Sequence, residues 1–598
     1  MLFGKHINRY YIKYAPRLLL GIVALIVVDY LQLIVPELYQ MTVNGINNST
    51  VLGSDGVLYQ FNMDFLLDKI CLPMIGIIVG MVFGRFLWRI CFFGAGIKAE
   101  TDLRSRMFDH CKELSQEYYQ KNKVGNLMSL FTNDLETVQD CFSSGVLMFC
   151  DALFLGLLAL VKMVNMNLVL ALLSLIPLVL LLLIGLTIGK YMTVKWETRQ
   201  EAFSKLSDFS QESFGGIAVI KAFVKEGKEL SAFKKLNKEN ETANVEYTKL
   251  STKLNIFVTL LVESVICVIL GYGGFLVHEN VFNAGQLVEY IGYFTAIVWP
   301  IMAVSELINM HSQGKASLNR ISELLDAKID VKDADTVTDI DAIRGDIEFK
   351  HLTFKYPDGE FNVLNDVSFK INAGESVGII GRTGSGKTTV ADLILRTYNV
   401  PDGTVFIDGA DINSIPIKTV RKYSAYVPQD NFLFSDTIEN NISFASDSKE
   451  QAKVIEAAKM SSVHENIEEF ALGYKTVLGE RGVTVSGGQK QRISIARAIM
   501  KDASILILDD SVSAVDVKTE KEILSNLKEM RRGKTTILIA HRVTTIENMD
   551  KIIFIDDGRV LAVGSHNELY NSCKEYRLTV DLQQLESKAN ESGVNNNA

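Results

Sequence analysis

The stretch Gly381-Arg382-Thr383-Gly384-Ser385-Gly386-Lys387-Thr388-Thr389 decides how the second half of this chain folds. It matches the pattern G-x-x-x-x-G-K-[ST] and lies between strand-like Ser376–Ile380 and helix-like Val390–Leu395. Glycines let backbone N–H groups turn toward phosphate oxygens, and the helix N-terminus adds partial positive charge. We expect Lys387 to reach the β- and γ-phosphates and the Thr388 hydroxyl to bind Mg²⁺. The stretch therefore predicts an α/β P-loop domain that binds a nucleoside triphosphate, with ATP as the expected ligand.

The composition of the chain changes near residue 320. The first part holds long apolar runs, whereas the second is typical of a soluble α/β domain. The net charge of −9 gives no support for a nucleic-acid partner, because neutralising phosphates requires clustered Lys and Arg. The seven cysteines form no C-x-x-C pair, so we interpret them as reduced thiols rather than as a disulfide or zinc framework.

The first part predicts a polytopic α-helical membrane domain. Six runs are long and apolar enough to cross a bilayer, which takes about 20 helical residues each. The first run is not a cleavable signal peptide, because its apolar part is too long and no small-residue cleavage site follows it. The predicted spans are Arg17–Leu38, Cys71–Gly94, Ser143–Val164, Leu168–Lys190, Asn255–Val277 and Ala284–Met310.

The distribution of Lys and Arg around these spans predicts their orientation. Basic residues precede the first span and follow the second, whereas Met41–Phe65 and His278–Asn283 contain none. Both termini are therefore expected in the cytosol, together with long helical loops at Ala95–Phe142 and Tyr191–Leu254. The absence of a targeting signal fits a multi-pass protein of a bacterial plasma (inner) membrane, with an organelle membrane left open.

Both long loops resemble those of ATP-binding-cassette (ABC) exporters. Ser115–Leu127, followed by Thr132-Asn133-Asp134, is similar to the first cytoplasmic loop of that family. Gln200-Glu201-Ala202, followed by Ser213–Phe223, is similar to the second. In the family, short coupling helices in these loops dock on the nucleotide-binding domains. The resemblance implies a six-span membrane domain of the type IV exporter kind.

The resemblance continues through the soluble part to about Leu569. Tyr356 matches a tyrosine that stacks on adenine, and Gln429, 42 positions after Lys387, matches a glutamine that helps to bind Mg²⁺. Val485-Ser486-Gly487-Gly488-Gln489 matches the signature that closes on the γ-phosphate of the other subunit's ATP, although Val stands where Leu is usual. The stretch Leu478–Gly482 resembles a loop found mainly in exporters.

Asp509 ends a strand-like run and matches the acid of the Mg²⁺ shell, while Asp516 matches the D-loop and His541 the switch histidine. Asp510 stands where family members usually carry the Glu that polarises the attacking water. Its carboxylate is set back by roughly 1 Å, which can lower the rate about 10²-fold, yet it can still accept a proton. The expected catalytic residues are Asp510 and His541; the expected ATP-binding residues are Tyr356, Gly381, Arg382, Thr383, Gly384, Ser385, Gly386, Lys387, Thr388, Thr389, Gln429, Ser486, Gly487, Gly488, Gln489 and Asp516; the expected Mg²⁺ residues are Thr388, Gln429 and Asp509.

In this family each ATP site combines the Walker motifs of one chain with the signature of another. A chain with Asp510 and an intact signature resembles the Asp-bearing subunit of heterodimeric bacterial multidrug exporters. Its own Walker motifs would form a degenerate site, and its partner would be a second half-transporter with Glu at that position. A homodimer that hydrolyses ATP slowly at two equal sites is the competing interpretation.

Ionisable residues inside the spans are candidates for contact with cargo. Asp151 and Glu263 lie about eight residues, or about 12 Å, from the expected cytosolic ends of their helices. They could attract cationic amphiphiles, or pair structurally with Arg85. We expect a hydrophobic or amphipathic cargo among membrane lipids, with lipids or peptides as alternative cargoes. A regulatory or channel-like ABC protein, gated by ATP, is the candidate from a different class.

The expected domains follow from these motifs. Residues 1–326 form the membrane domain, 327–345 a linker and 346–580 the nucleotide-binding domain. Residues 581–598 are polar and Asn-rich, and are expected to be disordered.

Overall fold

The computed structural model describes residues 4–52, 58–334, 336–446, 450–479, 482 and 485–595. The chain forms two compact units. The first consists of Met1–Lys112 with Lys123–Ala327, and the second of Glu113–Asn122 with Lys328–Ala598. A short segment from the middle of the first half of the sequence thus belongs to the second unit.

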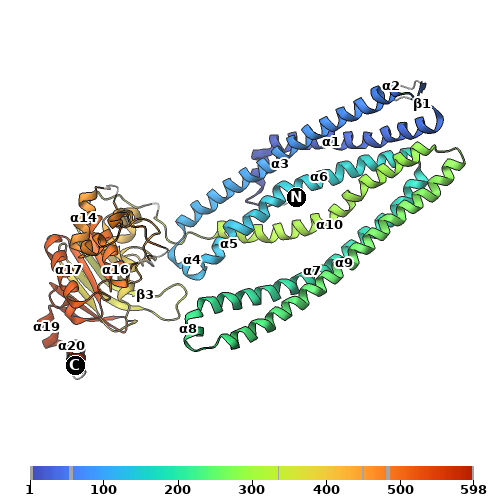
Figure 1. Cartoon of the computed structure of the whole chain (residues 1–598). Coiled ribbons are helices and arrows are strands. Elements are labelled where there is room, and N and C mark those ends of the chain that lie inside the picture. The colour runs from blue at the N-terminus through green and yellow to red at the C-terminus, as the bar shows by residue number, and fades with distance from the viewer. Residues whose placement is uncertain are drawn as a thin grey trace. The chain divides into compact units, whose positions relative to one another are not determined.

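The first unit is built from long helices (Figure 1). Each of the six predicted spans lies within one of them, except that Cys71 belongs to the turn before the second. The long helices are α1 (Asn8–Asn48), α3 (Leu72–Glu113), α6 (Leu135–Met166), α7 (Leu168–Gly215), α9 (Glu226–His278) and α10 (Ala284–Asp326). The short elements are β1 (Thr50–Leu52), β2 (Leu58–Gln60), α2 (Met63–Phe65), the π-type turns η1 (Leu66–Cys71) and η2 (Leu130–Asp134), α5 (Val124–Ser129) and α8 (Ile217–Ala222).

Among the described residues, five helices are long and apolar enough to cross a membrane: α1, α3, α6, α9 and α10. The described apolar part of α7 is Leu168–Pro177, and most side chains of the predicted span beyond it lie outside the described residues. With 53 residues, α9 is about 80 Å long, which exceeds the roughly 30 Å of a bilayer core. The helices therefore continue well past their apolar runs, as the sequence predicts.

Close packing holds the long helices together. α6 packs along α10, and α7 packs along α9 (Figure 1). The buried aromatic residues Tyr290, Tyr293 and Phe294 of α10 form part of the apolar core. Gly292 lies where α10 meets α1, and a Cβ atom there would be 2.7 Å from the side chain of Pro36. Small residues permit such close approach of helices in membranes.

The second unit contains two sheets. Within the described residues, the larger sheet has the strand order β12-β11-β5-β10-β9-β8 and the smaller has the order β4-β3-β6-β7. In the larger sheet β11 and β12 are antiparallel, and the other neighbours are parallel. The strands are β3 (Ile347–Phe354), β4 (Leu364–Ile371), β5 (Ser376–Ile380), β6 (Val405–Ile407), β7 (Ala410–Asp411), β8 (Ser424–Val427), β9 (Ile505–Asp509), β10 (Thr535–Ala540), β11 (Lys551–Asp556) and β12 (Arg559–Gly564).

Helices accompany the sheets of the second unit. α4 (Gln116–Lys121) is the element that this unit takes from the first half of the sequence. The others are α11 (Lys387–Ile394), α12 (Ile417–Lys422), α13 (Ile438–Ser443), α14 (Gln451–Met460), α15 (His464–Glu468), α16 (Gly487–Met500), α17 (Val517–Met530), α18 (Val543–Ile546), α19 (His566–Ser572) and α20 (Lys574–Asn595), with single turns η3 (Ile412–Ser414) and η4 (Gly473–Lys475).

The register of the parallel strands places the predicted site at one edge of the larger sheet. Ile380 is paired with Ala540, and Ile539 with Asp509. Strands β5, β9 and β10 are apolar along nearly their whole length because the sheet is buried on both faces. Their carboxyl ends lie side by side, so the loops after them, which carry the predicted phosphate loop, Asp510 and His541, start together.

The polar C-terminal segment carries the last helix of the second unit. α20 runs from Lys574 to Asn595, and 596–598 lie outside the described residues. Tyr576 and Val580 are buried and fix the start of this helix. The residues that follow include Leu, Gln, Glu, Lys and Ala, which favour helix despite their polar average.

Candidate functional site

The predicted phosphate loop joins β5 to α11 in a conformation that requires glycine. Gly384 and Gly386 have φ of +81° and +93°, and a Cβ atom on Gly386 would be 2.6 Å from Leu364. Lys387 is 5% exposed, and its Nζ donates hydrogen bonds to the carbonyl oxygens of Gly381 (2.9 Å) and Arg382 (2.7 Å). Burial lowers the pKa of Lys387, and neighbouring carboxylates oppose this. The ammonium group thus lies over the loop. Phosphate oxygens bound there would compete with the two carbonyl oxygens for its hydrogen bonds.

Asp509 provides a buried carboxylate beside this loop. It ends β9 and is 1% exposed. Burial raises its pKa, while a hydrogen bond with Thr388 and the charge of Lys387 lower it. Among the described residues, Asp509 Oδ2 and the buried Ser385 hydroxyl have no hydrogen-bond partner. An unpaired buried carboxylate oxygen next to a threonine hydroxyl fits a hard cation such as Mg²⁺, which prefers oxygen ligands.

Asp510 has an unusual backbone conformation. Its φ is +45°, in the left-handed region, which Asp adopts more readily than most residues with a side chain. Its N–H donates to the carbonyl of Ile539 (2.9 Å), and its carbonyl accepts from the Ser513 hydroxyl (2.9 Å). Hydrogen bonds on both sides therefore fix the backbone from which the half-buried carboxylate extends.

Tyr356 contacts the end of the phosphate loop. Its hydroxyl and that of Thr389 are 2.9 Å apart, and its ring lies edge-on to Phe354 and Tyr398. Burial raises the pKa of Tyr356 to about 12. Its hydroxyl also bonds to Asp392 of α11, whose pKa is raised to about 6 by burial and by the charge of Asp509. The aromatic residue expected at adenine is thus joined to the helix that begins with Lys387.

Gln429 and His541 occupy the loops after β8 and β10. Gln429 is exposed and His541 is half-buried. The His541 carbonyl accepts a hydrogen bond from Gln583 of α20 (2.8 Å). Among the described residues, the side chains of Gln429 and His541 make no hydrogen bond. The backbone therefore positions both residues near the edge of the sheet, but no hydrogen bond fixes their side chains.

The predicted signature begins α16 with a capping box. The Ser486 hydroxyl accepts from the N–H of Gln489, whose side chain accepts from the N–H of Ser486. Ser486 and Gly487 are exposed at this helix N-terminus. A Cβ atom on Gly488 would lie 2.9 Å from the carbonyl oxygen of Ala514, so the predicted D-loop packs directly on the signature. Of the loop 478–482, Glu480 and Arg481 lie outside the described residues.

Two further residues shape the D-loop. The side chain of Asp516 accepts from the N–H groups of Lys518 and Thr519 and caps α17. A hydrogen bond with the Thr519 side chain, followed by the bonds to backbone N–H groups, lowers the pKa of Asp516. Gln491, 7% exposed, accepts from the N–H of Ala514 (3.0 Å). Gln491 was not predicted as a site residue. The signal available in the sequence was a polar residue on the buried face of an amphipathic helix.

Family comparisons cover both parts of the chain. A model of the ABC transporter transmembrane region matches residues 18–301, and an ABC transporter model matches residues 364–513. A probable multidrug resistance ABC transporter ATP-binding/permease protein, YheI of Bacillus subtilis, is 34% identical over 97% of each chain. The chain belongs to the ABC transporter family. As a half-transporter it joins one membrane domain to one ATP-hydrolysing domain.

Other relatives agree over the full length. The half-transporter is 31% identical to the multidrug resistance-like ATP-binding protein MdlA of Escherichia coli, over 98% of each chain. Its fold is similar to that of a bacterial Atm1-family ABC exporter solved with ATP bound, with a TM-score of 0.77 and 25% identity. That match covers 96% of this chain and 99% of the other.

The residues that were predicted to contact cargo lie in different surroundings in the half-transporter. The carboxylate of Asp151 on α6 accepts from Trp299 Nε1 on α10 (2.8 Å). Asp29 of α1 lies within hydrogen-bonding reach of Asp151 and within electrostatic range of Arg85. Asp29 is 2% exposed and was not predicted, although an Asp inside the first apolar run was a visible signal. Glu263 is exposed on α9 and makes no ion pair or hydrogen bond among the described residues.

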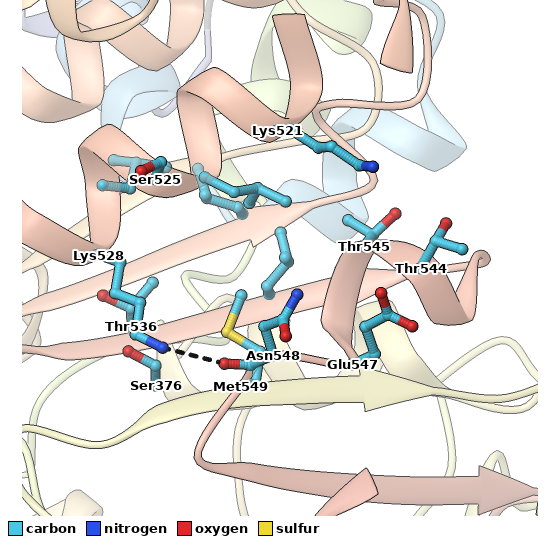
Figure 2. Close-up of a pocket in the computed structure, with 14 residues that line it drawn as sticks. Ser376, Lys521, Ser525, Lys528, Thr536, Thr544, Thr545, Glu547, Asn548 and Met549 are labelled. Carbon is cyan, nitrogen blue, oxygen red and sulfur yellow. Dashed lines mark hydrogen bonds between the residues drawn. The ribbon is translucent and has the colours of Figure 1, made fainter. Parts of the chain in front are cut away.

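A separate cavity lies within the second unit (Figure 2). It has a volume of about 490 Å³ and is lined by residues of α17 and by the segment from Thr544 to Met549. On one side the Lys528 ammonium donates to the carbonyl of Asn548 (3.3 Å). None of the predicted ATP-site residues lines this cavity.

Proposed function

We propose that this half-transporter exports hydrophobic or amphipathic compounds of the multidrug kind, as one half of a heterodimer. The full-length similarity to YheI and MdlA, whose names describe multidrug transport, supports the cargo class. The observation that carries the heterodimer is Asp510, which stands in place of the usual Glu beside an otherwise complete set of ATP-site residues.

The exposed signature supports a composite site. Ser486 and Gly487 begin α16, where free N–H groups and the helix dipole favour an anion such as the γ-phosphate of ATP held by another chain. We assign Lys387 to the β- and γ-phosphates and Tyr356 to adenine. Thr388 and Asp509 would hold Mg²⁺, with Gln429 as a further ligand. A Mg²⁺ ion held by these residues would supply positive charge to offset the negative charge that develops during phosphoryl transfer.

Asp510 and His541 are assigned to the reaction itself. Asp510 would orient the attacking water from its fixed backbone and accept its proton, at a rate lowered by the shorter side chain. His541 would contact the γ-phosphate. Closing of two nucleotide-binding domains around ATP and their reopening after hydrolysis would move the long helices between inward- and outward-facing states.

The heterodimer makes a direct prediction for ATP hydrolysis. In the complex with a partner that carries Glu at the matching position, Asp510→Ala is expected to lower ATPase activity less than twofold. Replacing that Glu by Gln in the partner is expected to abolish it, because catalysis depends on the composite site completed by Ser486 of this chain. Steady-state ATPase assays of the purified chain, the partner and the complex measure both effects.

The homodimeric interpretation gives the opposite result. If the chain alone forms an active ATPase that Asp510→Ala abolishes, Asp510 is a working base at two equal sites and the heterodimer is wrong. Lipid or peptide export by a homodimer would then become the favoured function.

The pair Asp29 and Asp151 supports a cationic cargo. The buried Asp29 Oδ2 has no hydrogen-bond partner among the described residues, and the adjacent Trp299 is half exposed. An acid next to an aromatic ring suits a lipophilic cation. Asp151→Asn is expected to slow efflux of a cationic dye at least fivefold and to spare a neutral hydrophobic dye. Equal loss for both dyes would contradict a role in charge recognition.

We also propose that the protein lies in a bacterial inner membrane with both termini in the cytosol. The absence of Lys and Arg from residues 41–65 supports this orientation. Single cysteines placed in residues 58–62 should then react with an impermeant maleimide added outside intact cells. If these cysteines react only after the cells are lysed, the segment faces the cytosol and the proposed orientation is wrong.

A further inference from the structure

Gln583 of helix α20 contacts the backbone around His541. Its amide nitrogen donates a hydrogen bond to the carbonyl of His541, and its amide oxygen accepts one from the N–H of Val543, both at 2.8 Å. The side-chain amide therefore bridges the residues on either side of Arg542. Only one orientation of the amide satisfies both bonds, since its nitrogen can only donate and its oxygen can only accept.

This bridge lies at the joint between β10 and α18. β10 ends at Ala540, and α18 begins at Val543. Arg542 is the N-cap residue of α18 and is extended, and among the described residues its side chain makes no cap hydrogen bond. The N–H groups in the first turn of a helix have no partner within that helix, so Gln583 satisfies one of them from another element. The amide thus takes the place that the peptide groups of a neighbouring strand would have.

The start of α20 holds Gln583 in a fixed place. The buried ring of Tyr576 packs edge-on against Phe554 of β11, with centroids 5.7 Å apart. Asp581, two residues before Gln583, accepts a hydrogen bond from the hydroxyl of Tyr570 in α19 at 2.9 Å. The helix is therefore anchored to the sheet and to α19 close to the residue that contacts the joint.

The imidazole of His541 depends on the backbone for its place. It is half-buried, and among the described residues it makes no hydrogen bond. The helix that follows is packed firmly: Ile546 is buried, and a Cβ atom on Gly378 of β5 would lie 2.7 Å from it. The Thr545 hydroxyl donates to the buried carboxylate of Glu520. Because the strand and the helix are both fixed, the backbone between them sets where the imidazole lies.

We propose that Gln583 is a positioning residue, which holds the backbone on both sides of Arg542 and thereby places the His541 imidazole at the γ-phosphate of ATP. Gln583 acts on the nucleotide only through His541. The inference rests on the contact proposed above between His541 and the γ-phosphate. It concerns the ATP that this chain itself holds, so it is independent of whether the partner is a second copy or a different chain.

Nucleotide affinity separates positioning from general stability, because ADP lacks the γ-phosphate. Gln583→Leu keeps the approximate size of the side chain and removes both hydrogen bonds. In the purified full-length chain in nanodiscs, it is expected to raise the Kd for a non-hydrolysable ATP analogue about five- to tenfold, within the range for loss of one hydrogen bond. The Kd for ADP should change less than about twofold, since no γ-phosphate contact is lost. Displacement of a fluorescent ADP analogue in the presence of Mg²⁺ measures both constants.

Gln583→Glu is the second variant. It keeps the length of the side chain and an acceptor for the N–H of Val543, but its carboxylate has no hydrogen to donate to the carbonyl of His541. It is expected to weaken binding of the ATP analogue and to spare binding of ADP.

Tyr570→Phe is the matched control. It removes the hydroxyl that bonds to Asp581 and so loosens α20, while both hydrogen bonds of Gln583 stay in place. The Kd values of this variant for the ATP analogue and for ADP should equal those of the wild type.

His541→Ala tests the role on which the inference rests. It should also weaken binding of the ATP analogue alone, and Gln583→Leu added to it should have no further effect, because both changes act through one side chain. A wild-type Kd for the ATP analogue in His541→Ala would show that the proposed contact with the γ-phosphate is wrong, whatever the Gln583 variants do.

Three other results would overturn the positioning role while the role of His541 stands. The first is wild-type binding of the ATP analogue in both Gln583→Leu and Gln583→Glu. The second is an equal loss of affinity for the ATP analogue and for ADP, which shows general loosening of the unit. The third is multiplication of the two effects when Gln583→Leu is combined with His541→Ala, which shows that the two residues act separately.

Discussion

At the scale of single residues, the phosphate loop is confined by neighbouring backbone rather than by side chains alone. A Cβ atom on Gly381 would lie 1.8 Å from the carbonyl oxygen of Ile555, at the end of β11. Backbone in a paired strand cannot move aside cheaply. Gly384 differs, because a Cβ atom there would have no heavy atom within 4 Å, although its φ is +81°.

These two glycines give a matched prediction. Gly381→Ala is expected to destabilise the second unit by about 3 kcal/mol and to abolish ATP binding, because overpacking forces β5 and β11 apart. Gly384→Ala is expected to cost about 1 kcal/mol, from the strained φ alone. Thermal unfolding of the full-length protein and binding of a fluorescent ATP analogue measure both. Similar losses for the two variants would show that the contact with Ile555 does not limit the loop.

Asp392 gives the unit a specific dependence on pH. Its pKa is raised from 3.8 to about 6, first by burial and then by the charge of Asp509. The folded state therefore holds a proton that the unfolded state releases, so stability is greatest below about pH 4, falls as pH rises to about 6 and is constant above that. The shift of about two units corresponds to up to about 3 kcal/mol.

Asp392→Asn should remove this dependence. At pH 7.5 the variant is expected to unfold at a higher temperature than the wild type, because it lacks the buried charge, and this difference should shrink as the pH falls from 6 to 5. Scanning the unfolding temperature of the full-length protein from pH 5 to pH 8 tests this. A parallel pH dependence in the variant would assign the effect to another group.

At the scale of elements, the contact between α16 and the predicted D-loop links two parts of the proposed ATP site. The Gln491 side chain accepts a hydrogen bond from the N–H of Ala514. Because Gly488 has no side chain, the carbonyl oxygen of Ala514 can pack closely against it. The predicted signature and the predicted D-loop are therefore in direct contact within this chain. In a composite site, both approach the ATP that the other chain holds.

Gln491→Leu is expected to break that link. The N–H of Ala514 would lose its buried acceptor, at about 1–3 kcal/mol, and kcat for ATP should fall about tenfold with little change in KM. Gln491→Glu keeps an acceptor oxygen at the same reach and should retain most of the activity. If both variants lose activity equally, the side chain acts through packing and not through this hydrogen bond.

The helices and strands also show which parts of the fold can be predicted from the sequence. Each predicted span lies in a long helix, apart from Cys71 of the second span. The predicted strand, loop and helix around Lys387 are β5 and α11 with the loop between them. These features follow from local pattern: apolar length, glycine spacing and a strand before a helix.

At the scale of the whole molecule, the features that could not be predicted join distant segments. Asp29 meets Asp151 from another helix, and Gln120 bonds to Tyr398 although 278 positions separate them. No periodicity or motif records such pairs, since each residue taken alone suits a span or a helical loop. The motifs predict which residues along the chain form the proposed ATP site, whereas the contacts that support these residues depend on the tertiary fold.

α4 comes from the membrane half of the sequence but belongs to the second unit. This limits how the halves of such transporters can be exchanged. A chimaera or natural recombinant joined within the predicted linker, residues 327–345, takes residue 120 from one parent and residue 398 from the other. Its nucleotide-binding unit is then a mosaic, even though the junction falls between the two domains of the sequence. Compatible parents must therefore match at these two positions as well as at the junction, which makes domain shuffling at that linker a selective process.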